Sequence, residues 1–326
     1  MKVLSQTHEL KVNNIRAVRK CFSDGNIWTK NELAEACGLS LAGTTNVLQQ
    51  MLAADEIIYV GDADSTGGRK SKNYILNKDF SHIGTIILEK KDMAQIRSTV
   101  YNLFGEVLDQ SERELNRIDD LDEQVAAMCA DPKVKVLIIS LPGVCVNGAV
   151  DVCDISFLEG VELISRYEER HGVKVIVEND VNVACIGLAE SFPDIAHLAF
   201  VYQPAQDYVG CGMIVDHHLH NGFSHFAGEL RYLPFYDHEE QDRLLKKDPQ
   251  SLLEKQILTL AAVINPQVIG YCSDVFEGAI KVTPSFSTTH MPQLVRIEYI
   301  EEKIAEGTFR IGIRKLMEGE ENGKVY

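Results

Sequence analysis

The sequence has no apolar run that approaches the roughly 18 residues a membrane-spanning helix needs. Its first residues, MKVLSQTHELKVNN, lack the apolar segment of a secretory signal. Its eight cysteines are scattered singly, with no CxxC pair, which is typical of reduced thiols rather than of disulfides or a thiolate metal site. We therefore expect a cytoplasmic protein that binds no metal through cysteine.

Positive charge is also scarce, since 32 Lys and Arg face 48 Asp and Glu and give a net charge of −16. Taken alone, this argues against a nucleic-acid-binding protein. The charge is uneven, however, because residues 1–79 hold ten basic and nine acidic residues, so the remainder carries −17. This asymmetry predicts two domains with separate tasks, residues 1–79 and residues 80–326.

The first domain has the pattern of a winged helix-turn-helix. Residues 13–24 place Ile15, Val18 and Phe22 on one face of a helix that Gly25 ends. In the next helix Thr29 is the expected N-cap and Glu32 its capping-box partner. Gly38 and Ser40 then predict a tight turn and the cap of a third helix.

The third helix is the candidate recognition helix. Its buried stripe is expected to comprise Val47, Leu48, Met51 and Leu52. That leaves short polar residues on the early, exposed side, of the kind that contacts base edges in the major groove. The predicted DNA-contacting residues of this helix are Thr44, Thr45, Asn46 and Gln49.

Residues 57–77 alternate like a hairpin with a glycine-rich tip. Arg69, Lys70 and Lys72 cluster there, where a wing would contact phosphates or enter the minor groove. The alternative is a small helical packing domain with a solvated basic hairpin. Helix spacing, turn glycine and basic tip together favour DNA binding.

The second domain alternates strand and helix, which indicates a mixed α/β fold with two related halves and a cleft between them. Strands are expected within residues 82–88, 95–108, 134–143, 174–177, 195–203 and 208–218, and helices within residues 120–130 and 158–172. Residues 252–272 read as a long helix that leads into another strand. After the strand at 174–177 come Asn179 and Asp180, at a position where α/β proteins present a base or a ligand-binding carboxylate.

Short motifs in order give a resemblance to a known family. STGGRKSKNY, GEVL, LPGV, VENDVNVACIG, VGCGMIV, HFAGELRYLPF and INPQVI follow one another along the chain. In this order the sequence resembles the ROK family of repressors and sugar kinases. The resemblance implies a two-lobed actin-like ATPase fold with sugar held in the cleft. Members with a fused winged helix are mostly sugar-responsive repressors.

The resemblance also implies site residues. Asp180 matches the base that takes a proton from the sugar hydroxyl, Asn179 matches a residue that orients the sugar, and Glu229 matches a second sugar-binding carboxylate. Pro142 and Gly143 would line the same cleft. The alternative for Asp180 is a helix N-cap. We expect all five to contact a ligand, with Asp180 a former base rather than a working one.

The nucleotide site is expected to be inactive. The family's first phosphate loop carries paired glycines where this chain has Leu88, Glu89 and Lys90. Side chains there would obstruct a phosphate, and Glu89 would repel it. In the second loop only Gly210 and Gly212 remain, and Asp207 adds negative charge.

The family's zinc site is expected to be missing as well. Tyr232 stands at the position of its histidine, and residues 233–253 contain no cysteine. The adjacent Asp237, His238 and Glu239 could not form a tetrahedral site by themselves. His217, His218 and His220 are expected to form a turn at a strand end. We therefore predict no metal and no cofactor.

These patterns favour a DNA-binding transcriptional regulator of sugar metabolism. It would be a homodimer or homotetramer, acting on operator DNA and responding to a sugar or sugar derivative, and it would not be an enzyme. One alternative is a divergent ROK kinase that phosphorylates a hexose and carries an appended helical domain. Another is a regulator whose second domain only dimerises.

Overall fold

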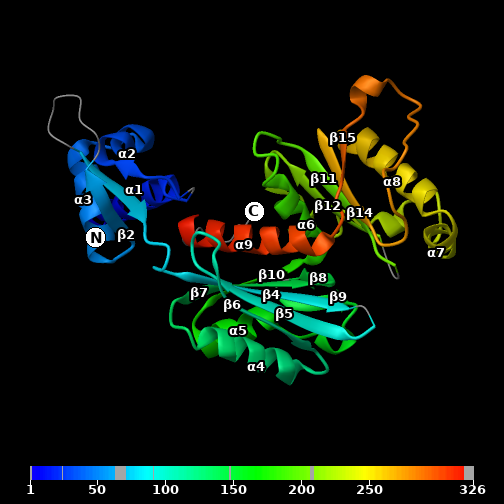
Figure 1. Cartoon of the computed structure of the whole chain (residues 1–326), viewed down its shortest axis with the longest axis horizontal. Coiled ribbons are helices and arrows are strands. Elements are labelled where there is room, and N and C mark those ends of the chain that lie inside the picture. Colours follow the sequence, from blue (N-terminus) through cyan, green and yellow to red (C-terminus); the bar gives the residue numbers. More distant parts are fainter. Residues whose placement is uncertain are drawn as a thin grey trace.

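The computed structural model describes residues 2–23, 25–62, 71–90, 92–146, 148–205 and 209–318. Figure 1 shows an N-terminal helical unit, two lobes built on separate sheets, and helix α9 running between these parts. Within the described residues, no helix is both long and apolar enough to cross a membrane.

The N-terminal unit has the element order of a winged helix. It contains α1 (Lys2–Cys21), β1 (Trp28–Thr29), α2 (Lys30–Cys37), α3 (Leu41–Ala53), β2 (Ile57–Asp62) and β3 (Lys72–Leu76). The strands form one antiparallel sheet in the order β1-β3-β2. The first helix was expected from residue 13 but begins at Lys2, because no glycine or proline precedes Gly25 to interrupt it.

The caps expected from the sequence are confirmed. The Glu32 amide donates to Thr29 Oγ1 at 3.3 Å, and the Thr29 amide donates to Glu32 Oε2 at 2.7 Å, which completes a capping box. The Gly43 amide donates to Ser40 Oγ at 3.1 Å at the start of α3. Because these contacts fix how α2 and α3 begin, the angle of the helix-turn-helix is set largely by local sequence. Its core comprises Val18, Phe22, Leu33, Val47, Leu48 and Met51.

The two lobes share one sheet topology. The first sheet has the order β10-β7-β4-β5-β6 and the second the order β13-β12-β11-β14-β15. In each, three antiparallel strands come first along the chain, and two further strands then pair in parallel beside the first of them. The expectation of two related halves is therefore confirmed. The strands of the first sheet are β4 (His82–Lys90), β5 (Ala94–Tyr101), β6 (Val107–Glu114), β7 (Val134–Leu141) and β10 (Lys174–Asn179), and those of the second are β11 (Leu198–Gln203), β12 (Gly210–Val215), β13 (His218–Leu219), β14 (Val268–Ser273) and β15 (Gln293–Arg296).

Helices cover the sheets on their outer faces. Figure 1 shows α4 (Ile118–Cys129) and α5 (Leu163–His171) beneath the first sheet, and α8 (Pro249–Val263) beside the second, preceded by α7 (His238–Lys247). The helix expected at residues 158–172 begins only at Leu163, because Gly160 has a φ of 76° and interrupts the helical backbone. The hairpin of β8 (Gly143–Val146) and β9 (Ala149–Cys153) was not expected.

Two helices lie between the lobes and hold them together. Helix α6 (Asp180–Ala189) follows the last strand of the first sheet but packs on β11 and β12 of the second. Helix α9 (Ile300–Glu318) follows the second sheet but packs on β4 and β7 of the first, and it also contacts α1. A Cβ added at Gly187 would lie 2.0 Å from the Lys303 oxygen, and one at Gly307 would lie 2.0 Å from the Val183 oxygen. The two helices can therefore cross this closely only because both residues are glycine.

Candidate functional site

A small polar pocket lies where the two lobes meet. Its lining comes from β8, from the junction of β10 and α6, from β12, and from the loop after β13. The lining residues are Val144, Cys145, Glu178, Asn179, Asn182, Gly210, Cys211, His225, Ala227 and Glu229. Of the five ligand-binding residues expected from the sequence, Asn179 and Glu229 are in this lining.

Asn179 organises the junction of β10 and α6. Its Oδ1 accepts hydrogen bonds from the amides of Val181 at 3.0 Å and Asn182 at 3.1 Å, so it is the N-cap of α6. Its Nδ2 donates to the Gly143 oxygen at 3.1 Å. The alternative in which Asp180 caps this helix is wrong, because Asp180 is already its first helical residue.

Glu178 is a pocket residue that the sequence reading missed. Its Oε1 accepts from the Asn179 amide and from Asn182 Nδ2, both at 2.9 Å. Asn182 Nδ2 also lies 3.4 Å from Asn221 Oδ1 in the loop of the second lobe. Burial raises the pKa of the Glu178 carboxyl, although the hydrogen bond from Asn182 and the nearby His225 oppose this. The pocket thus has a half-buried acidic group held by the Asn179 amide and the Asn182 side chain.

The opposite wall is a loop whose alternate residues His225, Ala227 and Glu229 line the pocket. Burial raises the pKa of Glu229, and the charge of Arg231 partly offsets this. The intervening Phe226 is instead half exposed and stacks with Tyr232 at a centroid distance of 5.1 Å. His225 is the first residue of the HFAGELRYLPF motif, but nothing in the local sequence indicates that its side chain lies near Glu178.

Asp180, Pro142 and Gly143 lie beside the pocket rather than in its lining. The Pro142 oxygen accepts from the Asp154 amide at 3.0 Å, and Gly143 pairs with Cys153 in the β8–β9 hairpin. A Cβ at Gly143 would lie 2.3 Å from the Val152 oxygen, so this glycine is required for the hairpin to close. These two residues position the pocket wall, and their contact with a ligand stays a prediction.

Asp180 is influenced by the charges of two other acidic residues of the first lobe. Burial raises its pKa to about 7, the Val181 amide at 2.8 Å lowers it, and the charges of Asp154 and Glu89 raise it further. Burial raises the pKa of Tyr202, as does the hydrogen bond that its hydroxyl donates to Asp274 Oδ2 at 2.7 Å, and the charge of Asp180 adds to this. Asp154 and Glu89 of the first lobe and Tyr202 of the second therefore interact electrostatically with Asp180.

The two segments expected to have lost phosphate binding have structural roles. Leu88 is buried in β4, and Glu89 pairs with Arg97 Nη1 at 3.1 Å. A Cβ at Gly210 would lie 2.6 Å from Val181 Cγ2, and one at Gly212 would lie 2.6 Å from Cys185 Cβ. Both glycines therefore allow α6 to pack on β12. Asp207 lies outside the described residues.

The residues at the positions of the family's zinc ligands make other contacts. Tyr232 stacks on Phe226 and lies 5.2 Å from the His238 ring, and Asp237 Oδ1 accepts from the Glu240 amide as the N-cap of α7. His217 lies in the turn between β12 and β13 with a φ of 64°, and His218 is the first residue of β13. No group of three or more potential metal ligands occurs among the residues that the structure describes.

The exposed face of α3 differs in one respect from the sequence expectation. Thr44 is fully buried, and its Oγ1 donates to the Ser40 oxygen at 3.1 Å, so its predicted base contact is wrong. Asn46 and Gln49 are exposed, and Thr45 is half exposed with its hydroxyl donating to the Leu41 oxygen at 2.6 Å. Helical phase explains the error, since residue 44 lies on the same face as Val47, Leu48 and Met51.

The wing is described only in part. Its strands β2 and β3 form the expected hairpin, and Lys72 is exposed with its Nζ 5.5 Å from the centre of the Tyr59 ring. Arg69 and Lys70 lie outside the described residues. Arg19 forms an ion pair with the buried Glu56, so its charge joins α1 to the start of the wing.

Two five-stranded sheets of one topology, joined by crossing helices and preceded by a winged helix, define a two-lobed actin-like protein with an N-terminal helix-turn-helix. No family model matches the chain. The chain is similar to the xylose repressor of Bacillus subtilis, with 22% identity over 249 residues, which is 72% of this chain and 63% of the relative. It is 24% identical over 236 residues to the xylose repressor of Caldicellulosiruptor bescii, covering 68% of this chain and 58% of the relative. The chain thus spans less than two thirds of the length of these curated relatives.

Solved structures share the fold. A ROK family transcriptional regulator, a homologue of the E. coli MLC protein, superposes over 95% of this chain and all of its own, with a TM-score of 0.65 and 16% identity. The ROK hexokinase of Thermus thermophilus covers 73% of this chain with a TM-score of 0.54 and 14% identity. These comparisons confirm the resemblance drawn from the motifs, and the chain has the fold of the ROK family of repressors and sugar kinases.

Proposed function

We propose that the chain is a DNA-binding transcriptional repressor whose two-lobed body binds a sugar. The observation that carries this proposal is a capped helix-turn-helix with exposed Asn46 and Gln49, joined to a body with a polar pocket between its lobes. The xylose repressors that it resembles support the same conclusion. A repressor of this type would work in the cytoplasm as a homodimer or homotetramer on a pseudo-palindromic operator.

The chemistry of the pocket suits a polyhydroxylated ligand. Carboxylates accept hydrogen bonds from sugar hydroxyls, and side-chain amides both accept and donate them. Glu178, Asn182 and Glu229 place such groups on both sides of the pocket. The pocket is small, which favours a monosaccharide. D-xylose is the first candidate because of the names of the relatives.

A continuous packing path connects the pocket with the DNA-binding unit. Helix α6 starts at the pocket lining, crosses α9 at Gly187 and Gly307, and α9 contacts α1. Figure 1 shows α9 extending from the second lobe across the first sheet toward the N-terminal unit. Sugar-dependent closure of the lobes would shift α6 against α9 and thereby change the placement of the winged helix. Coupling of this kind amounts to about 1–3 kcal/mol, or roughly 5–150-fold in DNA affinity.

We expect Glu229→Gln to abolish the rise in melting temperature that D-xylose gives the parent protein, measured by differential scanning fluorimetry. The substitution keeps the shape of the side chain but removes the charge that a sugar hydroxyl would contact. Glu239→Gln, an exposed residue of α7, is the matched control and should respond like the parent. If neither xylose nor a panel of other sugars and sugar phosphates stabilises the parent, the body serves only for dimerisation.

The divergent-kinase alternative makes a different prediction. Leu88 and Glu89 stand where the family's first phosphate loop has glycines, and their side chains would obstruct a phosphate. The chain should therefore not bind or hydrolyse ATP. Millimolar ATP with Mg²⁺ should leave the melting temperature unchanged, and no sugar-dependent ADP release should be detected in a coupled assay. Saturable ATP binding by calorimetry, or ADP release that Asp180→Asn abolishes, would establish the kinase instead.

A further inference from the structure

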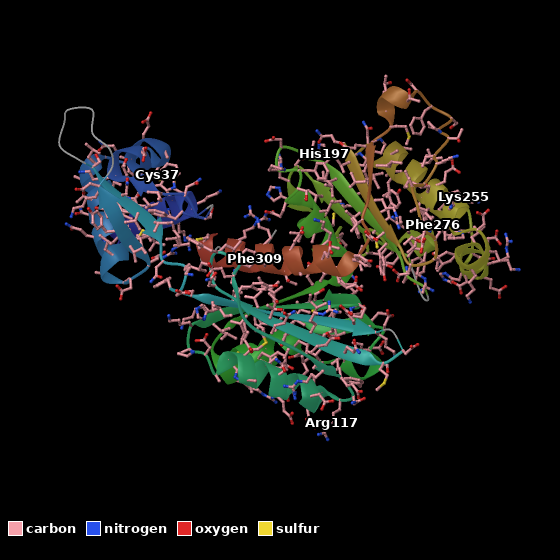
Figure 2. All side chains as sticks on the ribbon, in the orientation of Figure 1. Cys37, Arg117, His197, Lys255, Phe276 and Phe309 are labelled. Atoms are coloured by element: carbon pink, nitrogen blue, oxygen red, sulfur yellow. The ribbon has the colours of Figure 1, made fainter. Side chains whose placement is uncertain are left out.

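Two thiols meet in the N-terminal unit. Cys21 is the last residue of α1 and Cys37 the last residue of α2, and their Sγ atoms lie 3.4 Å apart. Both side chains are half-buried, so a small reagent can reach them. Figure 2 marks Cys37 in the N-terminal unit, away from the two lobes. The proposed repressor function makes no use of this pair.

The geometry is close to that of a disulfide. A disulfide bond is about 2.05 Å long, so the two sulfur atoms would have to approach by roughly 1.4 Å. Cys21 Sγ also donates to the Ala17 oxygen at 3.5 Å, a long and therefore weak hydrogen bond.

The surroundings of Cys37 slow its oxidation. Burial raises the pKa of the Cys37 thiol to about 12, and the contact with Cys21 adds to this. The C-terminal end of a helix also disfavours a thiolate. The Cys37 thiol is thus protonated at neutral pH, and oxidation that begins at Cys37 should accelerate as the pH rises.

We propose that Cys21 and Cys37 form a redox-modification site, in which a low-molecular-weight disulfide oxidises the two thiols to an intrachain disulfide joining α1 to α2. One cysteine thiolate attacks a sulfur of the small disulfide, forms a mixed disulfide and releases one small thiol. The second cysteine thiolate then attacks the protein sulfur of that mixed disulfide and releases the other small thiol. Two electrons and two protons pass to the oxidant, so one small disulfide becomes two thiols.

A disulfide between Cys21 and Cys37 would restrain the packing of the N-terminal helices. Helix α1 contacts both α2 and α9, and α2 packs on α3. A covalent bond between the ends of α1 and α2 would fix the helix-turn-helix on the helix that meets α9. The oxidised protein should therefore have a more stable N-terminal unit, observable as a higher unfolding midpoint by the fluorescence of Trp28, the single tryptophan.

The test uses the full chain with oxidised and reduced glutathione in varied ratio at pH 8, followed by alkylation and peptide mass mapping. We expect one linked pair of peptides containing Cys21 and Cys37, lighter by two hydrogens than the separate peptides, and full reversal by dithiothreitol. Cys21→Ser and Cys37→Ser should each remove the linked peptides and leave glutathione attached to the remaining cysteine. Cys185 and Cys211 are buried in the body and serve as internal controls that should stay unmodified in the folded protein.

The proposal is overturned if both thiols remain open to alkylation at every glutathione ratio. It is also overturned if the linkage joins other cysteines or two chains. Neither result bears on DNA or sugar binding, so failure here is distinguishable from failure of the repressor proposal.

Discussion

Replacing Asn46 and Gln49 together by alanine should abolish sequence-specific DNA binding while leaving the fold intact. Both side chains are exposed on α3, and amide side chains recognise adenine through paired hydrogen bonds. Each such contact contributes about 1–3 kcal/mol of discrimination, so the double variant should lose roughly 10²–10⁴-fold in affinity for its preferred site. Neither residue is charged, so the salt dependence of the remaining non-specific binding should match that of the parent.

The measurement begins with selection of preferred sites from random DNA by the parent protein, and fluorescence anisotropy then compares the variants on the selected site. Gln110→Ala, an exposed residue of β6, is the control of the same type and should bind like the parent. Unchanged affinity of the double variant at every salt concentration would show that α3 does not read the bases. A loss that Gln110→Ala shares would point to an effect outside the winged helix.

The N-terminal unit was predictable because its signals are local. The capping box of Thr29 and Glu32 and the Ser40 cap depend on residues three positions apart, and the structure has each of them. Thr44 was misplaced because it is a short polar residue next to the exposed ones. Its burial follows from the phase of the helix and not from its chemistry, and a threonine can enter a core when its hydroxyl bonds to the preceding turn.

The body was predicted less completely than the N-terminal unit. Most of its strands and helices follow from apolar periodicity, but β6, β15, α7, α9 and the β8–β9 hairpin were not anticipated. The pocket was predicted in part, because Asn179 and Glu229 belong to recognisable motifs. Glu178 and His225 reach the same pocket only through the approach of the two lobes, a long-range arrangement that neither local segment encodes.

Asn179 and Asp180 illustrate a second limit of prediction from the sequence. Asn179 and Asp180 are adjacent in sequence, yet one caps α6 and lines the pocket while the other faces Asp154 and Glu89. A strand that turns directly into a helix sends successive side chains in different directions. The motif therefore locates the site but does not say which of its residues contacts a ligand.

Asp180→Asn should stabilise the body at alkaline pH, and its advantage should shrink as the pH falls. Burial raises the pKa of Asp180 to about 7, whereas an unfolded aspartate titrates near 3.9. The folded chain therefore binds a proton that the unfolded chain has released between these values. The contribution of this group to stability is greatest below about pH 4 and is lost as the pH rises toward 7, when the folded carboxylate ionises beside Asp154 and Glu89.

Asparagine keeps the shape of the side chain and remains neutral, so the variant does not lose stability as the pH rises toward 7. We expect the free energy of unfolding of Asp180→Asn to exceed that of the parent by about 1–4 kcal/mol at pH 8, and the difference to be at least halved at pH 5. Urea unfolding followed by circular dichroism at each pH measures it. Asp151→Asn, an exposed aspartate of β9, also removes one charge and should keep a difference near zero throughout. Trp28 fluorescence reports the winged helix, and its transition should be the same in both proteins. A variant less stable than the parent at pH 8 would mean that Asp180 is ionised there and held by favourable contacts.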